Sequence, residues 1–330
     1  MSSRLAMVTG ATGFVGSHLV DALRAESVPI RAVVRATSTT QRLVAAGVEV
    51  VVADLADAAA LAEAMRGVSV VYHLAAATRA RGEAEYTRAN VETTAALMRA
   101  ARARSEPPRV VHLGSLAAVG PTADGRPVDE DAAPRPLTAY GRTKLAGERI
   151  ALGTEGVPVV ALRPPTVYGP RDRDLLTIFR MAARGLMPIP GGPDRPVQMI
   201  HVLDLVVALR AAADSPHSHR VYHVAEPVIR PWSEVADMVA RAVGTDPVRV
   251  RVPHALLRGA AALSEAIARL TGRATIFNRD KVLELIAPGW ICTTERAERE
   301  LGFRAAIPLE RGIPETAAWY RTEGWLSAAK

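Results

Sequence analysis

Short apolar, β-branched runs alternate with longer stretches of helical periodicity through the first half of the chain. The short runs lack polar alternation, which is typical of parallel strands that are covered by helices on both faces. They predict six strands, at Leu5–Thr9, Ile30–Arg35, Val48–Ala53, Val70–His73, Arg109–Gly114 and Val157–Arg163. The stretches between them predict helices over Phe14–Glu26, Thr39–Ala46, Ala58–Met65, Ala84–Arg104 and Thr138–Thr154. This alternation predicts an α/β fold with a doubly wound parallel sheet.

The pattern changes after Arg163, because prolines and glycines cluster between residues 164 and 196. Such residues interrupt regular elements, so this segment is expected to leave the sheet. A strand–helix pair returns over Val197–Ala213 and a strand over Val221–Val224, and the remainder is mainly helical in pattern. We therefore expect one domain of residues 1–165, to which residues 196–225 return. A smaller, mostly helical C-terminal lobe is expected from residues 166–195 and 226–330.

A glycine-rich turn joins the first strand to the first helix, with the sequence Gly10-Ala11-Thr12-Gly13-Phe14-Val15-Gly16. Glycine lets the backbone approach a ligand closely, and the helix N-terminus offers free N–H groups to phosphates. A strand, turn and helix in this order predict the pyrophosphate site of a Rossmann dinucleotide-binding fold, although the spacing is G-x-x-G-x-x-G rather than G-x-G-x-x-G. The expected cofactor contacts in this turn are Gly10, Thr12, Gly13, Phe14, Val15 and Gly16.

The end of the second strand bears on the choice between NADP and NAD. An acidic residue there binds the ribose 2′-hydroxyl, whereas an arginine accommodates a 2′-phosphate. Here the strand ends at Arg35, Arg42 follows one turn into the next helix, and no acidic residue lies between them. The sequence therefore favours NADP(H), with NAD(H) as the alternative; a solvated surface arginine is the other interpretation of Arg35.

Two further strand ends supply candidate cofactor contacts. Asp54 and Leu55 follow the third strand, where the aspartate either hydrogen-bonds adenine or caps the next helix. Ala75, Ala76 and Ala77 follow the fourth strand, and their small side chains let the backbone lie against the cofactor.

Ser115, Tyr140 and Lys144 form the candidate catalytic group. Tyr140 and Lys144 lie four residues apart on a predicted helix, so they share one face, and Ser115 lies at the carboxyl end of the fifth strand. A free tyrosine has a pKa of about 10, and a neighbouring ammonium is expected to lower that pKa. The serine hydroxyl can hold a carbonyl or carbinol oxygen. These residues suit hydride transfer, in which Tyr140 exchanges the proton and a nicotinamide carries the hydride.

Composition argues against several kinds of partner and site. The net charge of +7 comes almost entirely from arginines that are scattered among acidic residues, with only three lysines, so we expect no nucleic-acid partner. Runs of about 18 apolar residues are absent, so no integral membrane segment is expected. The first strand begins too early for a signal peptide. A single cysteine, Cys292, argues against disulfides and a cysteine-rich metal site, and we expect a cytoplasmic protein without a metal.

Together these residues resemble the extended short-chain dehydrogenase/reductase superfamily over essentially the whole chain. The residues that carry the resemblance are the glycine turn, Asp54, His73–Ala76, Asn90, Ser115, Tyr140–Lys144, Arg163–Pro170 and His201–Leu205. The resemblance implies that Lys144 also contacts the nicotinamide ribose and that the segment after Arg163, with Pro164 and Val167, lines the nicotinamide. It also implies that Asn90 supports the active-site helix, that the C-terminal lobe binds a small-molecule substrate, and that the protein is a homodimer.

Departures from the pattern of the sugar-modifying members bear on the substrate. Related dehydratases carry Asp-Glu shortly after the catalytic serine or threonine, but Ser115 is followed by leucine and two alanines. Sugar epimerases usually carry a diphosphate-binding arginine where this chain has Val197, and another in a stretch that here, at residues 282–288, contains no arginine. The chain thus resembles most the branch of 3β-hydroxysteroid dehydrogenases and dihydroflavonol reductases. We expect it to interconvert a ketone and a secondary alcohol on a fairly hydrophobic small molecule.

Two alternatives stay open at this point: a nucleotide-sugar 4-epimerase or related sugar enzyme, and a non-catalytic dinucleotide-binding subunit. One segment, residues 253–270, also has several interpretations. Its apolar residues recur at helical spacing. It is either a helix packed on the lobe, a lid over a lipid-like substrate, or a helix that lies on a membrane surface.

Overall fold

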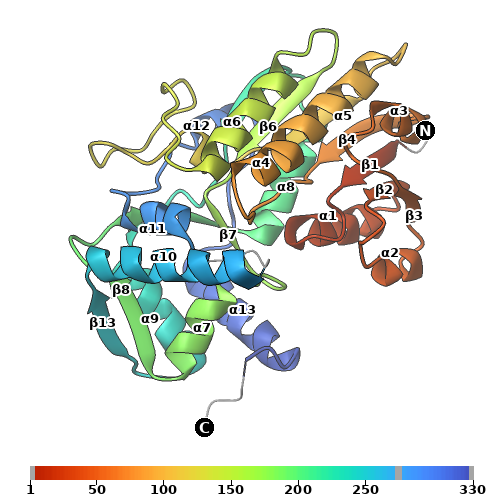
Figure 1. The fold of residues 1–330 in the computed structure, drawn as a ribbon. Helices are drawn as coiled ribbons and strands as arrows, with labels where there is room; N and C mark the ends of the chain where they lie inside the picture. The colour runs from red at the N-terminus through yellow and green to blue at the C-terminus, as the bar shows by residue number, and fades with distance from the viewer. Residues whose placement is uncertain (1–3, 272–276, 327–330) are drawn as a thin grey trace.

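The computed structural model describes residues 4–271 and 277–326, and its centre is a seven-stranded parallel sheet (Figure 1). The strand order is β11-β6-β5-β4-β1-β2-β3. All six strands expected from the sequence are present, and the strand near residue 221 adds a seventh at the edge. The strands are β1 (Leu5–Thr9), β2 (Ile30–Val34), β3 (Glu49–Val52), β4 (Val68–His73), β5 (Arg109–Leu113), β6 (Val159–Arg163) and β11 (Arg220–His223). The doubly wound Rossmann fold is therefore confirmed.

Helices cover both faces of this sheet. On one face α1 (Phe14–Ala25), α2 (Gln41–Ala45) and α8 (Val202–Asp214) pack over an apolar cluster centred on β1, β2 and β6. On the other face α3 (Ala58–Ala64), α5 (Thr93–Arg102) and α6 (Ala139–Leu152) bury a second cluster. Strands enclosed in this way are buried on both faces, which explains why their sequences are mainly apolar and lack polar alternation.

The long helix expected over residues 84–104 is divided into three parts. It consists of α4 (Glu83–Tyr86), a π-helical segment η1 (Thr87–Glu92) and α5. A π-helical turn widens the backbone locally and often marks a functional region. Here it carries Asn90, which is buried beneath α6.

The C-terminal lobe is mostly helical, as expected, and has its own apolar cluster formed by α7, α9 and α13. Its helices are α7 (Leu176–Ala183), α9 (Trp232–Val243), α10 (His254–Thr271), α11 (Arg279–Ile286) and α13 (Leu309–Thr322), while α12 (Glu295–Leu301) packs against the main sheet. Its short strands are β7 (Thr166–Tyr168), β8 (Leu186–Pro190), β9 (Pro196–Val197), β10 (Met199–His201), β12 (Arg230–Pro231) and β13 (Val248–Val252).

Two segments differ from the division drawn from the sequence. The strand expected at the start of Val197–Ala213 is β10, which pairs with β7 in a separate two-stranded sheet, and only the following helix, α8, covers the main sheet. Conversely, Ala297 and Phe303 pack in the apolar cluster under α1 and α8, although the sequence had assigned them to the lobe. No linker separates the two parts, so each part contains segments that are not consecutive in the sequence.

Helix α6 lies very close to its neighbours because two of its residues are glycines. A Cβ atom on Gly147 would overlap the Asn90 carbonyl oxygen, and one on Gly141 would overlap the Ala117 carbonyl oxygen. These close approaches set the position of Tyr140 and Lys144, which α6 carries.

We predict that Gly147→Ala lowers the free energy of unfolding by roughly 1–3 kcal/mol, because the added methyl group forces α6 away from backbone that cannot yield. The matched control is Gly259→Ala on α10, where nothing lies within 4 Å of the added Cβ. That control should be neutral or stabilising by up to about 1 kcal/mol, because alanine favours helix. Urea titrations of both variants measure the difference. Equal effects at the two positions would contradict the close-approach argument.

Candidate active site

The glycine turn lies at the centre of the sheet, between the carboxyl ends of β1 and β4. Gly10 has a φ of +74°, and a Cβ there would come within 2.8 Å of the Ala75 backbone nitrogen. A Cβ on Gly16 would overlap the Gly10 carbonyl oxygen. Only glycine fits both positions, so the turn is packed tightly under the place where a doubly wound sheet binds its dinucleotide.

The start of α1 is chemically suited to a pyrophosphate. Gly13 precedes α1 and has no side chain, so it offers no side-chain acceptor to the N–H groups of the first helical turn. Thr12 and Gly13 are exposed, and Phe14 and Val15 are half-buried. Unpaired N–H groups at the positive end of a helix dipole attract phosphate oxygens. The residues present therefore fit a nicotinamide dinucleotide.

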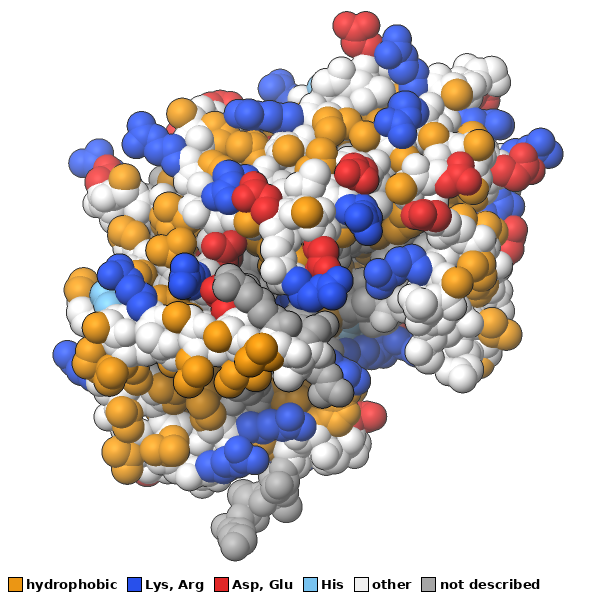
Figure 2. Space-filling model, in the orientation of Figure 1, with side chains coloured by type: hydrophobic (Ala, Val, Ile, Leu, Met, Phe, Trp, Pro, Cys, Tyr) orange, Lys and Arg blue, Asp and Glu red, His pale blue; other side chains and the backbone are white. Residues whose placement is uncertain are grey.

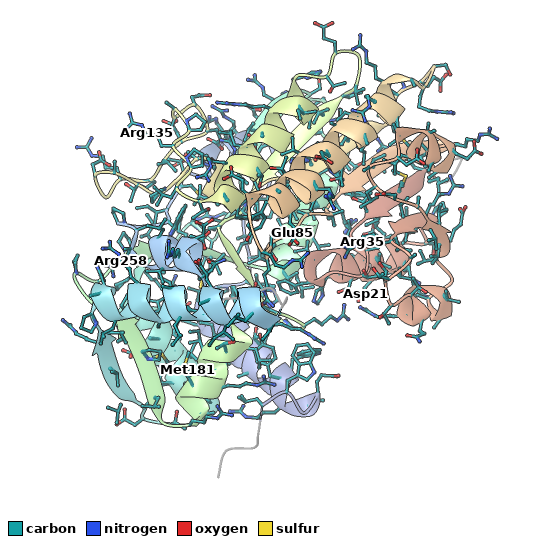
Figure 3. All side chains as sticks on the ribbon, in the orientation of Figure 1. Asp21, Arg35, Glu85, Arg135, Met181 and Arg258 are labelled. Atoms are coloured by element: carbon teal, nitrogen blue, oxygen red, sulfur yellow. The ribbon has the colours of Figure 1, made fainter. Side chains whose placement is uncertain are left out.

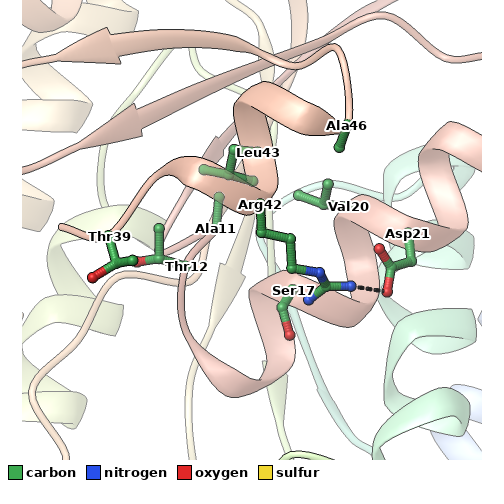
Figure 4. A pocket seen from close by; sticks show the side chains of 9 residues that line it. All are labelled: Ala11, Thr12, Ser17, Val20, Asp21, Thr39, Arg42, Leu43 and Ala46. Carbon is green, nitrogen blue, oxygen red and sulfur yellow. Dashed lines mark hydrogen bonds and ion pairs between the residues drawn. The ribbon is translucent and has the colours of Figure 1, made fainter.

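A small cleft continues from this turn between α1 and α2 (Figure 4). Its lining includes Thr12, Thr39 and Arg42. The Arg42 guanidinium forms an ion pair with Asp21 across the cleft, and Arg171 contacts the same carboxylate at 2.9 Å. Two cations thus share one anion, which leaves positive charge beside the turn. Arg35, labelled in Figure 3, follows β2 and is exposed.

The other expected cofactor contacts lie at the same edge of the sheet. Asp54 is exposed and accepts a hydrogen bond from Ala56 N at 3.0 Å, whereas Asp57 is the residue that caps α3. The capping interpretation of Asp54 is therefore wrong, and the adenine contact stays a prediction. The Leu55 side chain is buried in the core, so only its backbone faces the sheet edge.

The segment after β4 is held in place by polar side chains. Ala75 N donates to Thr9 Oγ1 at 3.2 Å, and Ala77 N donates to Asn90 Oδ1 at 2.8 Å. Ala76, between them, is exposed. The backbone of this segment is thus fixed while its small side chains leave space above it.

Asn90 also joins this segment to the catalytic helix, because its side-chain nitrogen donates to Thr143 Oγ1 on α6 at 3.0 Å. On the other side of the site, Pro164 is buried and its carbonyl accepts from Leu116 N at 2.8 Å, and Val167 lies on β7. Both follow β6, the strand next to β5, which ends just before Ser115.

Ser115 and Tyr140 are brought together by the capped starts of two helices. Ser115 follows β5 and caps η2 (Leu116–Ala118) by accepting from Ala117 N. Thr138 caps α6 by accepting from Gly141 N, which places Tyr140 in the first turn of that helix. The Ser115 hydroxyl lies close enough to the Tyr140 phenol to lower the pKa of that phenol. Residues far apart in sequence therefore meet at one carboxyl edge of the sheet.

The protonation of Tyr140 differs from the expectation. Burial raises the pKa of Tyr140 to about 12, and the nearby Ser115 hydroxyl only partly offsets this rise. The expected lowering by Lys144 is not found, because the Lys144 ammonium is turned to the backbone and donates to the Leu113 carbonyl at 2.6 Å. Tyr140 is therefore a phenol at neutral pH, ready to donate a proton.

Lys144 is a buried cation near the buried ion pair of Glu148 and Arg163. Burial lowers the pKa of Lys144 to about 8, and the nearby Glu148 carboxylate opposes this shift. Glu148 itself pairs with Arg163 at the end of β6 through two contacts of 2.8 and 2.5 Å. These groups are almost completely buried, so their mutual geometry fixes where the Lys144 side chain lies.

Comparison with known proteins decides the family. Residues 6–225 match the NAD dependent epimerase/dehydratase family. The chain belongs to this family. It is 32% identical to the ceramide reductase of Caulobacter vibrioides over 325 residues, covering 97% of this chain and 95% of the relative. It is 29% identical to the 4-hydroxy-2-methyl-3-oxo-4-farnesyl-3,4-dihydroquinoline-1-oxide ketoreductase of Stigmatella aurantiaca, covering 93% of each.

Among solved structures, MoeE5 in complex with UDP-glucose and NAD is 31% identical, with a TM-score of 0.75 over 96% of this chain and 99% of that one. The protein is thus an enzyme of the NAD dependent epimerase/dehydratase family, also called the extended short-chain dehydrogenases/reductases. Members of this family use a nicotinamide dinucleotide.

Sequence reasoning missed two acidic residues of α11. Asp280 accepts a hydrogen bond from Ala139 N at 2.8 Å and so holds the first turn of α6, beside Tyr140. Glu284, one turn further, contributes to the raised pKa of Tyr140. In the sequence, this segment was notable only because residues 282–288 contain no arginine. Asn278, which caps α11, was the available signal that a helix begins there.

The buried ammonium of Lys144 leads to a prediction about stability and pH. In the unfolded chain lysine titrates near 10.4, but in the folded enzyme near 8, so the unfolded state binds more protons between these values. Stability relative to a Lys144→Met variant should therefore rise as pH increases from about 8 to about 10, by roughly 3 kcal/mol. Paired urea titrations at several pH values measure this. A difference that does not change with pH would show that Lys144 titrates normally.

Proposed function

We propose that this enzyme is an NADP(H)-dependent reductase that interconverts a ketone and a secondary alcohol on a hydrophobic small molecule. The observation that carries the proposal is the meeting of Ser115 and Tyr140, with the buried Lys144 one helical turn away. We assign these three residues the catalytic roles. Gly10, Thr12, Gly13, Phe14, Val15 and Gly16 would hold the pyrophosphate, and Arg35 the 2′-phosphate.

The chemistry divides between the cofactor and the chain. The reduced nicotinamide supplies the hydride. Ser115 binds the substrate carbonyl oxygen, and Tyr140 donates its phenolic proton to that oxygen as the alcohol forms. By resemblance, Lys144 orients the nicotinamide ribose. In the oxidation direction the same proton returns to Tyr140.

Several features favour a hydrophobic substrate. Leu116, directly after Ser115, is buried, and no carboxylate follows it to support water elimination. Arg195, the arginine nearest to Val197, instead donates to the Gly191 carbonyl and lies 3.1 Å from His254 Nε2. It is therefore not directed at a diphosphate. The two relatives named as reductases act, by their names, on a ceramide and on a farnesylated quinoline.

A second candidate, a nucleotide-sugar 4-epimerase, is favoured by one observation, the 31% identity to MoeE5 with bound UDP-glucose and NAD. It requires the same catalytic residues but an NAD that stays bound, and arginines that grip the diphosphate. Arg35 at the end of β2 favours the reductase instead, and so does Val197, at the position where sugar epimerases usually carry an arginine.

The central test measures NADPH oxidation with panels of long-chain and polycyclic ketones, and with UDP-glucose as the competing substrate class. We expect turnover with the ketones, and a drop in kcat/KM of about 10² to 10⁴ in Tyr140→Phe, because general acid catalysis is worth that much. NADPH binding should persist in the variant. Interconversion of UDP-sugars with no ketone turnover would establish the epimerase in its place.

The cofactor preference is tested separately through Arg35. We expect Arg35→Ser to weaken NADPH binding by about ten- to a hundredfold, because a charge-assisted bond to phosphate is lost, while NADH binding stays unchanged. Arg66→Ser, another exposed arginine, which precedes β4 at the opposite end of the strands, is the matched control. Equal losses for both dinucleotides, or a wild-type enzyme that prefers NADH, would show that Arg35 does not read the 2′-phosphate.

A further inference from the structure

Helix α10 exposes its largest apolar side chains. Leu256, Leu263, Ile267 and Leu270 are 64%, 63%, 52% and 88% exposed, and with Ala260 they recur every three or four residues along one face. Helices that pack on a core bury such a stripe, so the expectation of an ordinary packed lobe helix fails for this face. The opposite side does pack: Ala261 is buried, and Glu265 pairs with Arg279 at the start of α11.

The apolar surface extends from α10 onto the strand before it. Val248 and Val250 on β13 are 67% and 42% exposed, and Leu186, which pairs with Val248, is 51% exposed. Figure 1 shows α10 crossing the front of the lobe next to β8 and β13, and Figure 2 shows hydrophobic side chains gathered over these elements. An exposed apolar surface this continuous is uncommon on a monomer and marks a contact site.

Positive charge accompanies this surface. Residues 248–271 contain four arginines and one glutamate, and that glutamate is already paired with Arg279. Arg251 and Arg258 (the latter labelled in Figure 3) are exposed and form no salt bridge with any residue in 4–271 or 277–326. Arg258 lies on the side of α10 away from the stripe, and a helix with apolar residues on one side and arginine on the other has the composition of helices that lie in the interface of an anionic bilayer.

We propose that α10 and β13 dock this enzyme on an anionic lipid surface. The apolar stripe would enter the boundary between headgroups and acyl chains, and Arg251 and Arg258 would meet the headgroup charges. A second copy of the chain fits less well, because it would bring the same unpaired arginines against themselves in a protein whose net charge is already +7. None of the helices in the described part of the chain is long and apolar enough to cross a membrane, so α10 would lie on the surface.

The position of α10 connects this surface to the catalytic residues. Arg279, which pairs with Glu265 of α10, begins α11, and Asp280 beside it holds the first turn of α6 next to Tyr140. Docking would therefore place the site one helix away from the lipid. This deepens the proposed function and rests on it in one respect, the expectation that the hydrophobic ketone is delivered from the bilayer.

The test is co-sedimentation with vesicles of phosphatidylcholine alone and of phosphatidylcholine mixed with phosphatidylglycerol. We expect the wild type to sediment with the anionic vesicles, less with the neutral ones, and less at high salt. Leu263→Asp/Ile267→Asp should reduce the bound fraction about tenfold or more. The matched control is Leu203→Asp/Val207→Asp on α8, an exposed apolar pair with the same spacing (44% and 51% exposed), which should bind like the wild type.

Arg251→Glu/Arg258→Glu provides a second variant that leaves the apolar stripe intact, and it should lose only the preference for anionic vesicles. Turnover of a water-soluble short-chain ketone should be unchanged in all three variants, which separates failure of docking from failure of the catalytic proposal. Vesicle binding that is unaffected by the α10 changes would overturn the proposal. So would a wild-type dimer in sedimentation velocity that only the Leu263→Asp/Ile267→Asp variant dissociates, since the surface would then join two copies.

Discussion

A buried ammonium group has to be kept in place for this site to exist. Lys144 lies almost fully inside the protein, and among the residues that the structure describes, the Leu113 carbonyl and the nearby Glu148 carboxylate compensate its charge. An unpaired charge in such surroundings is costly, so Glu148 must also be held, which Arg163 does at the end of β6. These contacts connect α6 to β5 and β6. The sheet, rather than a loop, therefore sets the position of the helix that carries Tyr140 and Lys144.

The same constraint explains the glycines and the π-helical turn around α6. A helix that carries buried charges must lie close to the strands whose carbonyls it uses, and side chains at Gly141 and Gly147 would prevent this. The widened η1 segment brings Asn90 within reach of Thr143 and of the backbone at Ala77. One side chain therefore ties the catalytic helix to the segment proposed to lie against the cofactor, and a shift of α6 would disturb both.

The strands and most helices could be predicted because burial on both faces leaves a simple apolar pattern, and spacing together with the strand ends made Ser115, Tyr140 and Lys144 the candidate catalytic group. The protonation of Tyr140 could not, because it depends on which carbonyl Lys144 reaches and on how deeply the phenol is buried. The hydrogen bond from Ala139 N to Asp280 could not be predicted either, because Asp280 is 140 positions from Tyr140 in the sequence. The sequence showed the apolar stripe of α10, but only the fold shows that its large side chains face outward.

The raised pKa of Tyr140 and the lowered pKa of Lys144 have one cause, burial, which favours the uncharged form of each group. A phenol that holds its proton until a carbonyl oxygen accepts it is a better acid for reduction than a phenolate. Lys144 does not take part in this balance directly, because its ammonium is held on the Leu113 carbonyl and beside Glu148. Burial therefore leaves a protonated phenol beside Ser115, while the strand backbone, not the phenol, holds the ammonium.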